Sequence, residues 1–153
     1  MSKLILSVAV VMERLKLSNP WQPYRWEAQG VIPDGAAPGT APRILMQDGE
    51  RLQMLFPGFQ LALHRSEAEN YYLNLSTPTP KVFIAWRPQD ELAAPWLVTV
   101  SYGEAARMMD ASEQVDAVAM PPDIADWVGD FVNKNYQPEP RKKIRRRDPL
   151  REE

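Results

Sequence analysis

The sequence predicts a mainly β fold of the α+β class. We expect a small antiparallel sandwich or partly open barrel of about six to seven strands, with one short helix and one C-terminal amphipathic helix packed on it. Apolar and polar residues alternate in short runs through residues 1–102, which is typical of half-buried strands. Fifteen prolines against seven glycines favour short elements joined by rigid turns. A clear helical apolar period appears only after residue 120.

Seven short runs have strand character, and turn residues separate them. The separators include the proline-containing loop 19–23, the proline-glycine connector 33–42 and the Pro57-Gly58 pair. We expect the run before and the run after the Thr-Pro repeat 77–80 to form a β-hairpin. The expected strands are 4–12, 24–32, 51–56, 59–64, 68–76, 81–87 and 95–102.

Two helices are expected after the strands. Residues 103–110 are rich in helix formers, and Ser101 with Glu104 matches a capping box. Pro122 begins a second helix with an apolar stripe that must pack on the sheet. The stripe consists of Ile124, Trp127, Val128, Phe131 and Val132.

Composition limits the possible chemistry. The chain has 153 residues, no cysteine and one histidine, which excludes disulfides, thiolate sites and multi-histidine metal sites. We therefore expect no metal and no cofactor. The apolar run 4–12 is too short to cross a bilayer and is followed by charged residues, so we expect a cytoplasmic protein.

Charge divides the chain into one domain, 1–136, and a basic disordered tail, 137–153. Eleven basic and sixteen acidic residues give the domain a charge of −5, whereas seven basic and four acidic residues give the tail +3. An electrostatic role for the tail rests on Arg141, Lys142, Lys143, Arg145, Arg146 and Arg147. Nucleic-acid binding through the tail is one alternative function, but the tail has no interleaved aromatic residues for base stacking, and the acidic domain opposes it.

Aromatic and basic residues gather in three candidate sites for a protein partner. For the first group, residues 21–26, a structural cation–π contact within the loop after the first strand is an equally good explanation. A further alternative is an enzyme or small-molecule binder, with His64 as general base beside Glu67 and Glu69, which requires these side chains to converge in a pocket. Solvated surface acids are the commoner case. The candidate partner-binding residues are Trp21, Tyr24, Arg25, Trp26, His64, Arg65, Glu67, Asn70, Tyr72, Trp86 and Arg87.

Four stretches carry a family resemblance: SVAVVMERLKLSNPWQPYRWEAQGV, LHRSEAENYYLNLSTPTPKVFIAWR, VTVSYGEAARMMDASEQVDAVAMPPDIADWVGDFV and YQPEPRKKIRRRD. Together they resemble a small proteobacterial family of unknown function, encoded beside genes for molybdenum-dependent formate dehydrogenases. The resemblance implies an accessory or adaptor role in maturing or docking such an enzyme. The implied partner is a formate dehydrogenase subunit or its maturation factor. It implies no catalytic residues.

Overall fold

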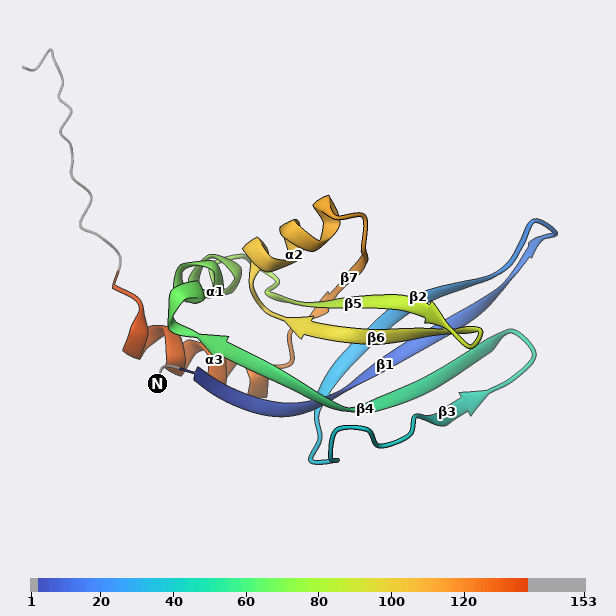
Figure 1. Ribbon diagram of the computed structural model, residues 1–153, viewed down its shortest axis with the longest axis horizontal. Coiled ribbons are helices and arrows are strands. Elements are labelled where there is room, and N and C mark those ends of the chain that lie inside the picture. The colour runs from blue at the N-terminus through green and yellow to red at the C-terminus, as the bar shows by residue number, and fades with distance from the viewer. Residues whose placement is uncertain (1–2, 138–153) are drawn as a thin grey trace, which may run out of the picture.

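Two antiparallel sheets form the body of the protein in the computed structural model, which describes residues 3–137 (Figure 1). The four-stranded sheet has the order β2-β1-β4-β3, and the three-stranded sheet has the order β6-β5-β7. The strands of the first sheet are β1 (Lys3–Asn19), β2 (Gln22–Pro33), β3 (Arg43–Gln47) and β4 (Arg51–His64). Those of the second are β5 (Lys81–Gln89), β6 (Leu92–Thr99) and β7 (Gln114–Ala119).

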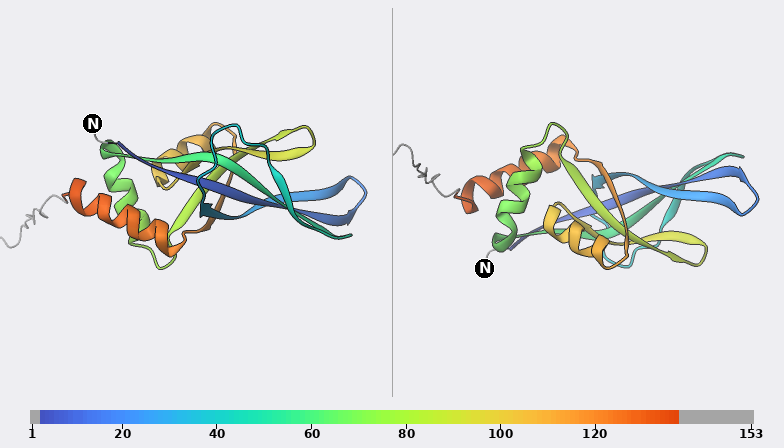
Figure 2. Two further views of the ribbon diagram at one scale, coloured as in Figure 1. Left: turned by 90° about the horizontal axis from the view of Figure 1, so that it is seen from below. Right: turned by 90° about the horizontal axis from the view of Figure 1, so that it is seen from above.

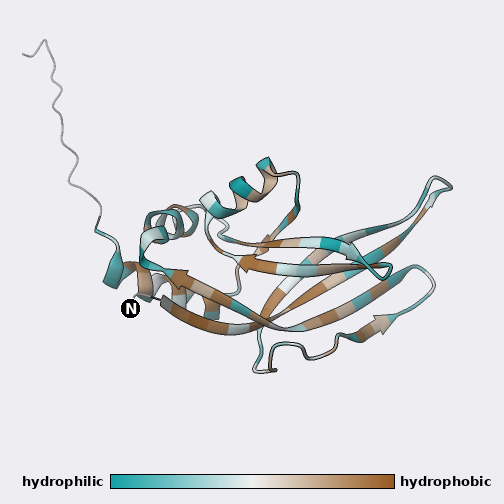
Figure 3. Cartoon of the chain, in the orientation of Figure 1, coloured by the Kyte–Doolittle hydropathy of each residue, from teal (hydrophilic) through white to brown (hydrophobic). Residues whose placement is uncertain are grey.

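The sheets enclose one apolar core, with β6 beside β4 and β7 beside β2. Hydrophobic positions follow β1, β4 and β5 (Figure 3), and Val8, Val10 and Ile84 are completely buried. Within the described residues the strands do not close into a barrel. The expected mainly β fold is therefore confirmed.

Within residues 3–137, three α-helices complete the fold, and a short 3₁₀ helix (Arg65–Glu67) precedes the first of them. Helices α1 (Ala68–Leu75) and α3 (Pro122–Asn135) pack together at one end (Figure 2), where the Tyr71 and Phe131 rings meet edge-on at 6.0 Å. Helix α2 (Tyr102–Asp110) contacts β5 and β7. The apolar stripe of α3 is buried as expected, except that Trp127 is only half-buried.

Segment 68–76 is α1 and not the expected strand, so the hairpin across 77–80 is wrong. Its aromatic and leucine residues satisfy a two-residue period, but burial of Ala68, Tyr71 and Asn74 follows a helical period. The expected strands 51–56 and 59–64 are one continuous strand, β4. The expected strand 95–102 is shifted, because β6 spans Leu92–Thr99 and Tyr102 begins α2.

Pro57-Gly58 is a β-bulge and not a turn, since Phe56 and Phe59 pair with Val10 and Val8 on either side of it. Gly58 has φ +88°, and a Cβ there would lie 2.7 Å from the carbonyl oxygen of Ala37. The connector between β2 and β3 thus passes directly over the bulge. It must cross the sheet because β2 and β3 form its opposite edges.

Candidate partner-binding surface

The β1–β2 hairpin ends in a projection that we call the arm, residues 14–26 (Figure 1). With the β3–β4 turn, it reaches past the end of the three-stranded sheet (Figure 2). Trp21 lies in its turn with 91% of its surface exposed, and its backbone N–H donates to the Asn19 side chain at 2.9 Å. The arm therefore presents a large aromatic ring on a hydrogen-bonded turn.

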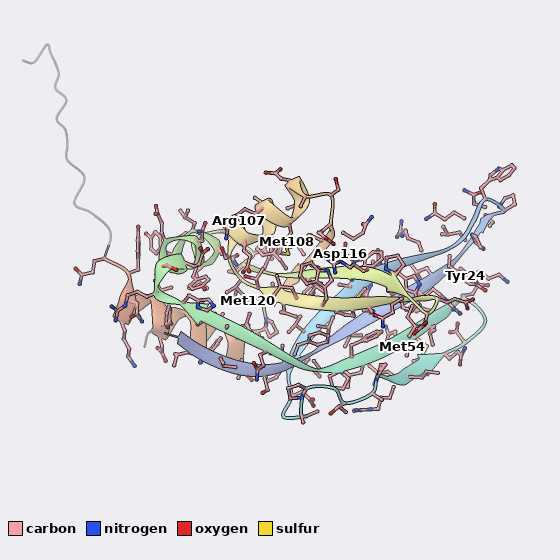
Figure 4. The ribbon with its side chains drawn as sticks, in the orientation of Figure 1. Tyr24, Met54, Arg107, Met108, Asp116 and Met120 are labelled. Atoms are coloured by element: carbon pink, nitrogen blue, oxygen red, sulfur yellow. The ribbon has the colours of Figure 1, made fainter. Side chains whose placement is uncertain are left out.

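One face of the arm carries a stacked cation. Arg14 is paired with Trp26 across the strands, and Lys16 with Tyr24, so these four side chains share a face. The Arg14 guanidinium carbon lies 4.2 Å from the centre of the Tyr24 ring and 6.0 Å from that of Trp26. Figure 4 shows Tyr24 at the arm end of the molecule. Sequence reasoning missed Arg14, because the pairing that brings it to the rings is set by the strand register.

The opposite face of the arm carries Arg25, which forms an ion pair with Glu27 at 3.2 Å. Alternation along β2 places Arg25 away from Tyr24 and Trp26, although the sequence grouped the three residues. The expected aromatic-basic group is thus divided between two faces, and Arg14 replaces Arg25 beside the rings.

Trp86 and Arg87 occupy structural positions on β5. The carboxylate of Asp116 accepts hydrogen bonds from Trp86 Nε1 at 3.1 Å and from the Ala28 backbone N–H at 2.8 Å, which connects the two sheets. Arg87 donates two hydrogen bonds to Glu113, at 3.0 and 2.8 Å, which lower the pKa of the Glu113 carboxyl.

The His64 corner lies at the helical end, far from the arm (Figure 1). The His64 side chain is exposed, whereas its backbone N–H donates to the Tyr71 hydroxyl at 2.9 Å. Burial raises the pKa of that hydroxyl to about 12. Arg65 donates to the Asn135 side chain at 3.3 Å, and the Tyr72 ring lies 4.9 Å from that of Tyr136. The structure does not bring this corner and the arm together.

Glu67 joins α1 to α2. Its carboxylate accepts hydrogen bonds from Ser101 Oγ at 2.6 Å and from Asn70 Nδ2 at 3.1 Å, and it lies 3.7 Å from Arg107. Ser101 also caps α2 by accepting the Glu104 N–H at 3.0 Å, which is one half of the expected capping box, while its own backbone N–H donates to Thr99 Oγ1 at 3.1 Å. Glu69 is exposed on α1. The carboxylates therefore do not converge with His64 on a shared site.

Comparison with known proteins identifies the family of this chain. A family model described as a protein of unknown function, DUF3305, matches residues 7–146. The chain belongs to the DUF3305 family. No curated protein and no solved structure matches it.

The DUF3305 match includes the whole arm, so the stacked Arg14 lies inside the family domain.

The domain also has a pocket of about 380 Å³ between β6 and α2, which neither His64 nor Glu69 lines. Across residues 3–137, no group of three or more histidine, aspartate or glutamate residues could hold a metal ion. The same part of the chain has no helix that is both long and apolar enough to span a membrane. The predicted basic tail falls mostly outside the described residues.

Proposed function

We propose that this DUF3305 chain is a non-enzymatic accessory or adaptor protein that binds a protein partner through its arm. The observation that carries the proposal is Trp21, 91% exposed at the tip of a projecting hairpin. Tryptophan, tyrosine and arginine dominate the energetics of protein interfaces, and the arm combines all three. A hairpin already held by its strand ladder has little further ordering entropy to lose on binding.

The proposed partner is a formate dehydrogenase subunit or a factor that matures it, in the cytoplasm. The family resemblance of the sequence supports this partner. The basic tail adds electrostatic attraction and so raises the association rate, in a manner that salt weakens.

The catalytic alternative has less support. His64 and Glu69 are exposed, and the Glu67 carboxylate is occupied by hydrogen bonds within the protein. The nucleic-acid alternative depends on the tail alone, and sixteen acidic residues in 1–136 oppose it.

The test is capture of purified formate dehydrogenase complex by the immobilised full-length chain. We expect Trp21→Ala to reduce the captured amount at least tenfold, because Trp21 contributes large apolar area without supporting the core. Met109→Ala is the control, since Met109 is an exposed apolar residue on α2, outside the arm and outside the other candidate sites. Equal capture by Trp21→Ala and the parent would remove the arm as the binding surface.

A further inference from the structure

The geometry points to the Arg14 face of the arm as the binding site for an acidic, extended segment of the partner protein. This inference rests on the proposed function and names the chemistry of the partner. We define the Arg14 face by Arg14, Lys16, Tyr24 and Trp26, which share one side of the hairpin.

Arg14 is positioned for anion recognition. The Tyr24 ring supports its guanidinium at 4.2 Å, and the side chain is half-buried. Among residues 3–137, no carboxylate lies within the 4.0 Å ion-pair distance of Arg14 or Lys16. A stacked guanidinium keeps its planar set of donors available and has already lost much of its rotamer freedom. A carboxylate can therefore bind it at a small entropic cost.

The acids that border the arm do not neutralise this face. Glu13 is buried on the opposite face, where its carboxylate lies 3.2 Å from Arg51. Glu27 binds Arg25 at 3.2 Å and Gln29 at 3.1 Å. Because neighbouring residues of a strand face opposite sides, both carboxylates point away from Arg14. Glu50 adjoins Lys16, whose backbone N–H donates to the Glu50 carbonyl oxygen at 2.9 Å, but within the described residues the Glu50 carboxylate forms no ion pair with Lys16. The cations of the Arg14 face are thus left for an external anion.

Charge is separated along the whole domain. The arm has three basic and no acidic residues, whereas the rest of 1–136 has eight basic and sixteen acidic residues. An anionic bilayer or a nucleic-acid backbone would meet this acidic body as well as the arm, and would be repelled by it. A single acidic segment of a protein can contact the arm alone, so protein is the class that the charge distribution favours.

The spacing of the cations indicates an extended ligand. Arg14 and Lys16 are two positions apart on β1, which separates their side chains by about 6.8 Å along the strand. Carboxylates at alternate positions of an extended peptide have the same spacing. The Tyr24 ring, which is 43% exposed, lies beside the two cations and provides an apolar surface for the aliphatic parts of that peptide. Trp26 packs partly against the core and supports this face from behind.

The probe is a ten-residue peptide with glutamate at alternate positions and threonine between, titrated into the full-length chain and followed by residue-resolved NMR. We expect the largest amide shifts in residues 14–26, and we expect Arg14→Ala to weaken that binding at least tenfold. Arg43→Ala is the control, because Arg43 is an exposed cation on β3. Unchanged affinity in Arg14→Ala, or arm shifts that are absent, would overturn the inference.

Two further experiments distinguish a protein ligand from a membrane or nucleic acid, and distinguish the Arg14 face from the arm as a whole. Stronger arm binding of phosphatidylglycerol vesicles or of a ten-nucleotide oligothymidylate than of the peptide would overturn the choice of protein. In the capture experiment, one decisive result is that Trp21→Ala loses the captured formate dehydrogenase while Arg14→Ala retains all of it. That result would contradict binding of an acidic segment at the Arg14 face and would leave the arm as the binding surface. Full retention with Trp21→Ala would contradict the proposed function itself.

Discussion

Replacing Asn74 with alanine should strongly destabilise the helical end of the protein. Asn74 is completely buried in α1. Its Nδ2 donates to the carbonyl oxygens of Lys81 at 2.7 Å and Val100 at 3.0 Å, and its Oδ1 accepts the Lys81 N–H at 2.9 Å. One side chain thus connects α1 to the start of β5 and to the residue after β6.

The loss should be about 3–5 kcal/mol of unfolding free energy, because the substitution leaves three backbone groups without partners and each such group costs roughly 1–3 kcal/mol. Lys81 is half-exposed, so water can hydrogen-bond to its freed backbone groups. Each of these two groups therefore costs about 1 kcal/mol, the lower end of the range per group. Urea unfolding of the variant measures the loss. Asn133→Ala is the control, since Asn133 is exposed on α3. A variant with parental stability would refute this account of α1.

The bulge and the surface ion pair give two further predictions. Gly58→Ala should lower the free energy of unfolding by about 1–3 kcal/mol, because φ is +88° and the new Cβ would meet the Ala37 carbonyl oxygen. Thermal melting measures this loss, and a variant that melts like the parent would show that the bulge relaxes freely. Glu113→Gln should destabilise the protein at neutral pH and less so in acid, because the Arg87 hydrogen bonds lower the folded pKa of Glu113. That stabilisation is present above the unfolded pKa and is lost as pH falls through the folded pKa, so parental and variant melting curves should converge in acid; a constant difference would contradict the link to Glu113.

Local signals predicted α2, which begins at a side-chain cap, and α3, which has a periodic apolar stripe. The hydroxyl of Ser101 accepts the Glu104 N–H, and the stripe of α3 packs on the core as its period indicates. Both patterns depend on residues three or four positions apart, which a sequence displays directly.

Pairing between distant residues could not be predicted in the same way. Strands β3 and β7 were missed because both are short edge strands without a strong apolar alternation. Segment 68–76 was misassigned because short runs of tyrosine and leucine fit a strand and a helix equally well. At the candidate site, the contact between Arg14 and Tyr24 depends on the register of β1 against β2, which no local pattern specifies.

We propose that the tip of the arm contacts a protein partner. Photocrosslinking in cells with Trp21→p-benzoylphenylalanine, which keeps an aromatic side chain at the tip, tests this contact most directly. Met109→p-benzoylphenylalanine is the control at an exposed position of α2. We predict one strong adduct at position 21, containing a formate dehydrogenase subunit or maturation factor, and no such adduct at position 109. The same adducts at both positions, or none at position 21, would contradict the claim.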